Sequence, residues 1–372
     1  MRVLRKAVAW VVGLLLVVPG TTAAAAPPHG TPAGIEVTGE RWIGDRLLEL
    51  TVRSEALGGP ATVRLLTPDG WEDRAPGERW PVLYLLAGGH GDPEAWTEDY
   101  AVDRLPHLRD VLVVMPSMPL FGFYSDWWNH GDGGAPRVET FHLGEVRPML
   151  ERFYGAGNRR AAAGESQGGF GALAYAARHP GLFRAVAGFS GYVHPLQHPR
   201  AVRAGLDYLG IDPLALWGDP VAQRRIWQAH DPYYRPDRLR GVAVHLAGGD
   251  GRAGALDPPG TEPDPHVPGL EDPENPLPKD VLSPTEAIMG GGEPGDGRPA
   301  ARPRGAGHHA LLPGHPLPAL LGARVAQRAA GAAAQPRALR VLGGGVYDGA
   351  GEPSGSSSGS GSRGSSTSCS RR

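Results

Sequence analysis

Short apolar runs alternate with helical patterns over residues 40–290 of the chain. Residues 41–54 and 60–67 alternate apolar and polar side chains, which is typical of two antiparallel edge strands. Continuous apolar runs are typical of buried parallel strands, and they occur at residues 80–86, 111–115, 183–189 and 242–247. Apolar residues recur at helical spacing over residues 138–154. This alternation predicts an α/β fold of three layers, with helices covering a mostly parallel sheet.

The two ends of the chain have a different composition. Residues 1–26 combine a basic start, an apolar core over residues 7–18 and small residues at 23–26, which predicts a secretory signal peptide. An uncleaved N-terminal anchor is the alternative interpretation. Residues 27–39 are rich in Pro and Gly and are expected to form a linker, so the folded domain is expected over residues 40–289. Residues 290–372 contain no Phe or Trp, and Tyr347 is their single Tyr, so a low-complexity tail is expected there.

Charge and cysteine content exclude several classes of function. The formal net charge of −2 gives no argument for binding nucleic acid or an anionic membrane surface. Cys369 is the single cysteine, so neither an intramolecular disulfide nor a cysteine-based metal site can form. Beyond the signal-like segment there is no long apolar run. We therefore expect an exported protein with no integral membrane segment in its mature form, and no metal or organic cofactor.

One short motif carries the chemistry. An apolar run is followed by Gly164-Glu165-Ser166-Gln167-Gly168-Gly169 and then by a helical pattern. This is the G-x-S-x-G nucleophile elbow, in which a sharp turn between strand and helix exposes a serine hydroxyl. The hydroxyl becomes nucleophilic when a nearby base takes its proton. The motif predicts Ser166 as the nucleophile, and the N–H of Gln167 as one donor to an oxyanion. A glycine-rich turn that happens to contain serine is the structural alternative.

Four segments resemble the esterase-D-like α/β-hydrolases, and among these the secreted mycolyltransferases of the antigen-85 complex and related actinobacterial esterases. The resemblance covers about residues 40–290. It rests on Leu85-Leu86-Ala87-Gly88-Gly89, on Phe123-Tyr124-Ser125-Asp126-Trp127-Trp128, on residues 155–160 leading into the elbow, and on His179-Pro180-Gly181-Leu182-Phe183 with Phe189-Ser190-Gly191. It implies an α/β-hydrolase fold and acyl transfer through an acyl-serine.

The resemblance also assigns the remaining site residues. Gly89 is implied as the second oxyanion donor. The family's acid matches Glu286, which opens a helix after the strand that ends at Ala247, whereas other branches of the family place it near Asp250. We prefer Glu286 and keep Asp250 as the alternative. Three further residues are expected at the substrate pocket: His90, Asp126 and Trp127, of which Asp126 is expected to brace a loop rather than to react.

Two positions bear on the substrate. The mycolyltransferases hold their sugar acceptor with an aspartate and an arginine, and the matching positions here are Ala87 and His90. Transfer of a mycolyl group to trehalose is therefore not favoured, and hydrolysis of small-molecule or lipid esters is. Transfer of an acyl group to a sugar or diacylglycerol is the first alternative. An exported binding or adhesion protein with a decayed site is the second.

None of the histidines near the C-terminal end lies in the sequence segment in which the family carries its catalytic base. The family places it in a segment like Thr-His-Phe-Tyr-Pro-Gly-Thr-His-Ser, whereas this chain offers His308, His309 and His315 in other surroundings. Shifting the reading frame by one base over residues 310–317 permits His-Phe-Tyr-Pro-Gly-Thr-His-Ser, with the second histidine encoded across Pro316. The middle base of each shifted codon is unconstrained, so this match permits the segment without proving it.

We therefore interpret the chain as leaving its ancestral frame near residues 287–300. On this interpretation Cys369 and the three histidines are accidental, the true base is out of frame at Pro316, and the last strand of the sheet is missing. The sheet should then have an unpaired edge, and the chain should be poorly folded or nearly inactive. The alternative is a divergent but genuine C-terminal half that uses His315 as its base.

Overall fold

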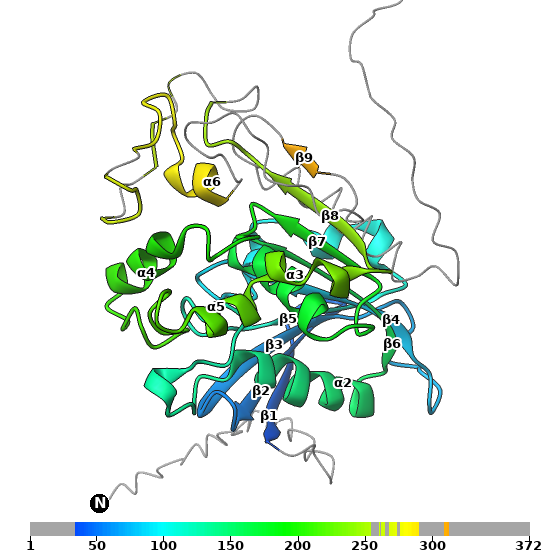
Figure 1. Cartoon of the computed structure of the whole chain (residues 1–372). Coiled ribbons are helices and arrows are strands. Elements are labelled where there is room, and N and C mark those ends of the chain that lie inside the picture. The colour runs from blue at the N-terminus through cyan, green and yellow to red at the C-terminus, as the bar shows by residue number, and fades with distance from the viewer. Residues whose placement is uncertain are drawn as a thin grey trace, which may run out of the picture. The chain divides into compact units, whose positions relative to one another are not determined.

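The computed structural model describes residues 34–253, 260, 262–264, 268–273 and 276–289, together with the backbone of residues 309–311. Its centre is a nine-stranded sheet with the order β1-β2-β3-β5-β4-β6-β7-β8-β9 (Figure 1). The predicted signal peptide, the end of the tail, His315, Pro316 and Cys369 lie outside the described residues.

One end of the sheet is antiparallel. It consists of β1 (Ile35–Trp42), β2 (Leu47–Ser54) and β3 (Gly59–Leu66), and β3 pairs antiparallel with β5 (Leu112–Pro116). The two predicted edge strands are confirmed as β2 and β3, but a third strand precedes them. The expected linker over residues 27–39 was wrong in its last residues, because β1 begins at Ile35. Ile35 and Val37 are buried in the core, so apolar burial overrides the Gly content of this segment.

The other strands run parallel, as the continuous apolar runs at residues 80–86, 183–189 and 242–247 predict. Going outward from β5 they are β4 (Trp80–Leu86), β6 (Ala156–Glu165), β7 (Ala185–Phe189), β8 (Ala243–Gly248) and β9 (His309–Leu311).

Strand β9 corrects one expectation. Leu246, Ala247 and Gly248 of β8 pair in parallel with residues 309–311, so the edge of β8 is not left unpaired over these three residues. The expected domain limit at residue 289 is also wrong for this reason, because residues beyond it contribute a strand to the sheet. The apolar pair Ala310-Leu311 is too short to be recognised as a strand from its sequence pattern alone.

Helices on one face of the sheet bury its main core. They are the π-helical η4 (Thr140–Val146), which continues into α2 (Arg147–Phe153), and α3 (Gln167–Arg178). Phe141, Val146 and Leu150 are fully buried against sheet residues such as Val82 and Val114. The helix predicted over residues 138–154 is therefore confirmed, with an opening turn wound more loosely than an α-helix.

Short helical segments cover the other face. These are α1 (Ala95–Glu98), η1 (Val102–Arg104) and η2 (Pro106–Leu108), whose Trp96, Val102 and Leu108 pack on Leu83 and Val113 of the sheet. Alternate residues of β4 thus enter two separate apolar clusters. With helical segments on both faces, the predicted three-layer α/β architecture is confirmed.

A third apolar cluster lies beyond α3. It joins Phe170 and Ala174 of α3 to the fully buried Trp217 and Trp227 and to Ile288. Three helices after β7 contribute to it: α4 (Pro199–Tyr208), α5 (Arg224–His230) and α6 (Pro284–Met289). The short η5 (Pro232–Tyr234) and η6 (Pro236–Leu239) follow α5 and also contact α3. The mixed helix and loop expected over residues 198–230 is thus a packed layer on α3. Among the described residues, no helix is long and apolar enough to cross a membrane.

Candidate active site

Ser166 lies in the sharp turn between β6 and α3, at the carboxyl edge of the parallel strands. Its backbone has φ 54° and ψ −120°, a conformation that side chains rarely adopt. Two hydrogen bonds hold it there: Ser166 N donates to Phe189 O at 2.8 Å, and Phe170 N donates to Ser166 O at 3.2 Å. Such strain persists where the surrounding structure over-determines the conformation, and it is typical of functional sites.

The glycines of the elbow are required by close packing. A Cβ on Gly164 would lie 2.1 Å from the carbonyl carbon of Gly168, and one on Gly168 would lie 1.8 Å from Leu86 O. Neither glycine is among the residues with positive φ. The strained backbone therefore belongs to Ser166 itself, while the glycines let the first turn of α3 touch β4 and β6.

The two predicted oxyanion donors lie on adjacent segments. Gln167 is buried at the start of α3, and its Nε2 lies 3.1 Å from the position a Cβ would take on Gly89. The Gln167 Oε1 accepts a hydrogen bond from Phe123 N at 3.3 Å, and Gly89 O accepts one from Phe121 N at 2.8 Å. Within the described residues, neither the Gly89 nor the Gln167 N–H donates to a protein acceptor. Both are available to a developing oxyanion.

Helix α6 brings the preferred acid close to the nucleophile. Glu286 is buried, and its Oε1 accepts hydrogen bonds from Ser190 Oγ at 2.9 Å and from Gly249 N. One turn later in the same helix, Met289 Sδ lies 3.8 Å from Ser166 Oγ. Ser190 and Gly249 directly follow β7 and β8, so the acid sits at the same sheet edge as Ser166.

Asp250 faces a different set of partners. Its Oδ1 accepts a hydrogen bond from Arg252 N at 3.0 Å, and its Oδ2 forms an ion pair with the same arginine at 3.4 Å. The side chain is 42% exposed. Asp250 is thus paired with Arg252 in the turn after β8, whereas Glu286 is buried and bonded to Ser190 and Gly249.

A second carboxyl group at the site was not predicted. Glu165 directly precedes Ser166, and its Oε2 lies 2.6 Å from the position a Cβ would take on Gly88. Burial, together with the charge of Glu286, raises the pKa of Glu165 to about 7. The one signal in the sequence was a charged residue shortly after the apolar run of residues 161–163.

No described histidine ring hydrogen-bonds to Ser166. Several are engaged elsewhere: His142 with Tyr175 Oη and Ser117 O, His179 with Glu139, and His194 with Asp231. His315 and Pro316 lie outside the described residues, and only the backbone of His309 is described. The described histidines thus do not supply a base hydrogen-bonded to Ser166.

The residues expected at the substrate pocket are dispersed. His90 is exposed on the loop after Gly89, and Trp127 is buried in the third apolar cluster with its Nε1 donating to Gly122 O at 3.1 Å. Asp126 accepts hydrogen bonds from Thr140 N at 2.9 Å and from Thr140 Oγ1 at 2.6 Å. It lines a groove with Arg178, at the opposite end of α3 from Ser166. The two hydrogen bonds to Thr140 connect the segment of Asp126 to the start of η4.

Comparisons with known proteins agree with this geometry. A family model described as a putative esterase matches residues 54–257. An esterase of Mycobacterium tuberculosis is 31% identical over 216 residues, which are 55% of this chain and 46% of that protein. The MPT51 antigen of Mycobacterium leprae is 38% identical over 181 residues, 44% of this chain and 58% of that protein. The chain thus spans about half the length of the curated relatives it matches.

A solved structure is also similar. The crystal structure of MPT51 from Mycobacterium tuberculosis aligns with 55% of this chain and 74% of that chain, at 27% identity and a TM-score of 0.45.

The close packing of the elbow predicts the effect of one added methyl group. Gly168→Ala places a Cβ against Leu86 O, so we expect it to lower the free energy of unfolding by about 3 kcal/mol or more. Gly59→Ala is the matched control, because a Cβ there meets nothing within 4 Å. Urea unfolding of both variants measures the difference. Equal stabilities would show that α3 does not approach β4 as closely as described.

The raised pKa of Glu165 predicts a pH-dependent stability. Between pH 4.5, the ordinary value, and about 7, the folded protein keeps a proton that the unfolded chain has released. The free energy of unfolding should therefore fall as the pH rises through this window, by on the order of 2 kcal/mol. Glu165→Gln should flatten this slope, whereas Glu262→Gln, at an exposed position, should not. Urea titrations across the window test this, and an unchanged slope in Glu165→Gln would contradict it.

Proposed function

The chain belongs to the putative esterase family, and from this premise we propose that it is a serine esterase acting through an acyl-serine intermediate. The observation that carries the proposal is the convergence of Ser166, the Gly89 and Gln167 amides and Glu286 at one edge of the sheet. Gly89, Ser166 and Gln167 belong to segments that follow the parallel strands β4 and β6. Glu286 accepts hydrogen bonds from the residues that follow β7 and β8. This is the edge at which open α/β sheets bind their ligands.

The proposed mechanism applies to a form of the chain in which a histidine reaches Ser166. A histidine accepts the proton of Ser166 Oγ as the oxygen attacks the ester carbonyl, and the oxyanion is held by the two amides. The histidine then protonates the departing alcohol, which leaves Ser166 acylated. Water, deprotonated by the same histidine, attacks the acyl-serine and releases the acid. Glu286 orients the imidazole and stabilises its charged form, and no metal or organic cofactor takes part.

We propose small-molecule or lipid esters as substrates. The positions that match the acceptor-binding aspartate and arginine of the mycolyltransferases are Ala87, which is buried, and His90, which is exposed. Neither supplies a carboxylate to a sugar hydroxyl. Hydrolysis is therefore favoured over transfer to a sugar, and product analysis with an added alcohol separates the two.

We also propose that the chain as encoded lacks its base and is impaired, with the ancestral histidine out of frame at Pro316. The support is that the described histidines do not reach Ser166 and that the shifted frame permits a complete family segment. The competing assignment is His315, which lies four residues beyond the end of β9. Export through residues 1–26 belongs to the same proposal, and N-terminal sequencing of the exported protein tests it.

Hydrolysis of short p-nitrophenyl esters discriminates between the two bases. The chain as encoded should act near the background rate, because an isolated oxyanion hole supplies only a small part of the catalysis. A variant with the shifted frame restored should be at least about a thousandfold faster. Strong hydrolysis by the encoded chain, abolished by His315→Ala, would contradict the frame hypothesis while supporting the esterase.

The choice of acid is tested in whichever of these two forms is active. Glu286→Gln should lower kcat at least about a hundredfold, because a neutral amide cannot stabilise an imidazolium. Asp250→Asn should leave kcat within about twofold, since Asp250 faces Arg252. The reverse ranking of the two variants would exchange the roles of Glu286 and Asp250.

A further inference from the structure

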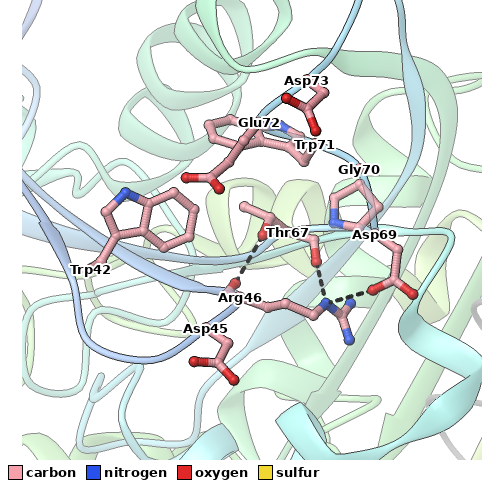
Figure 2. A pocket seen from close by; sticks show the side chains of 10 residues that line it. Trp42, Asp45, Arg46, Thr67, Asp69, Gly70, Trp71, Glu72 and Asp73 are labelled. Carbon is pink, nitrogen blue, oxygen red and sulfur yellow. Dashed lines mark hydrogen bonds and ion pairs between the residues drawn. The ribbon is translucent and has the colours of Figure 1, made fainter.

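A cavity lies at the end of the sheet opposite to Ser166. It is formed by residues 42–46, at the turn from β1 to β2, and by residues 67–73, which follow β3, and it has a volume of about 260 Å³ (Figure 2). Trp71 of this cavity donates its Nε1–H to Tyr154 O at 2.9 Å. Tyr154 lies just before β6 and Ser166 just after it, so roughly 30 Å separate the two places.

An aromatic side chain forms one wall of the cavity and stays half open. Trp42 is 42% exposed, the one tryptophan among the exposed large hydrophobic residues in the described part of the chain. Its position is fixed by Trp71, with ring centroids 6.0 Å apart and an interplanar angle of 71°. Trp71 in turn contacts the ring of Tyr154, with centroids 6.4 Å apart, and the Arg74 guanidinium, 3.9 Å from its centroid. The indole of Trp42 is therefore a positioned apolar surface with access to solvent.

Hydrogen-bond acceptors and a hydrogen-bond donor group surround this surface. The carboxylates of Asp45, Glu72 and Asp73 form no hydrogen bond or ion pair with other described residues, and Figure 2 shows the Glu72 carboxylate on the side facing Trp42. Arg46 forms the polar floor, where its Nε makes an ion pair with Oδ1 of Asp69, a further residue of the lining, at 3.4 Å (Figure 2). The Arg46 guanidinium donates to Thr67 O and to Leu108 O, each at 2.7 Å. Carboxylates accept hydrogen bonds and a guanidinium donates them, so the cavity offers both next to an indole ring.

We propose that this cavity is a binding site for a neutral saccharide of one or two rings. The apolar face of a sugar ring would lie on Trp42, while its hydroxyls donate to Glu72 and Asp45 and accept from Arg46. The volume lies just below the usual range for small-molecule sites, which suits a ligand of this size. The proposal goes beyond the esterase function and does not depend on it.

Charged ligands fit less well. An anion would meet the three unpaired carboxylates. An ammonium ion only donates hydrogen bonds, so it would leave the remaining Arg46 N–H groups without an acceptor. The described residues contain no group of three ligands able to hold a metal ion. A polyhydroxylated neutral ligand satisfies acceptors and donors together without placing a charge next to a like charge.

The experiment is a saccharide titration of the full chain. Glucose, mannose, galactose and arabinose, and disaccharides of each hexose, are titrated by ligand-observed NMR with calorimetry on any that bind. We expect saturable binding of at least one sugar, weakened about tenfold or more by Trp42→Ala and by Glu72→Gln. Tyr208→Ala, at a tyrosine that is 63% exposed on α4, is the matched aromatic control and should bind as the wild type does. Ser166→Ala should also bind normally.

Each other outcome overturns the proposal. Saturable sugar binding that survives Trp42→Ala would place the sugar elsewhere, and binding lost in Ser166→Ala would place it in the esterase site. Binding of choline or spermidine, but of no sugar, would make this a cation site. No saturable binding of any sugar would show that the cavity holds solvent only. Thermal unfolding of each variant separates loss of the site from loss of the fold, and Glu72→Gln keeps the test valid if Trp42→Ala unfolds.

Discussion

The contact between the first turn of α3 and the strands beneath it determines the geometry of the site. Gly168 lies so close to Leu86 O that no side chain can be accommodated, and Gly164 meets Gly168 in the same way. This packing forces the chain to turn within one residue, which leaves Ser166 with its strained backbone. Because β4 and β6 are neighbours in the sheet, the same contact also sets the distance between Ser166 and the Gly88-Gly89 segment after β4.

A second interaction ties the far side of the site to this centre. Glu286 accepts hydrogen bonds from Ser190 and Gly249, so the short helix α6 is fastened to the ends of β7 and β8. That attachment carries Met289 to Ser166 Oγ. It also places the Glu286 charge near Glu165, whose pKa it raises together with burial. The site thus holds two carboxyl groups, one hydrogen-bonded at the expected position of the acid and one desolvated below the nucleophile.

Much of the parallel sheet could be predicted from the sequence because buried parallel strands are apolar on both faces, as Val82–Leu86 and Val113–Met115 are. The elbow was predictable because its glycines are a local requirement. Strand β1 was missed because Gly and Pro precede it, and β9 because three residues carry no periodicity. The sequence pattern could not show that the length of α3 separates the groove lined by Asp126 from Ser166. Glu165 was missed because its effect depends on Glu286, which is distant in sequence and adjacent in space.

The most direct test of the account is labelling of the full chain with a fluorophosphonate probe, followed by mass spectrometry of the modified peptide. The account predicts covalent labelling at Ser166 that disappears in Ser166→Ala, slow in the chain as encoded and fast when the shifted frame is restored. A folded protein that takes up no label at Ser166 in either form would contradict it, because the strained turn and the two amides would then serve no activated serine.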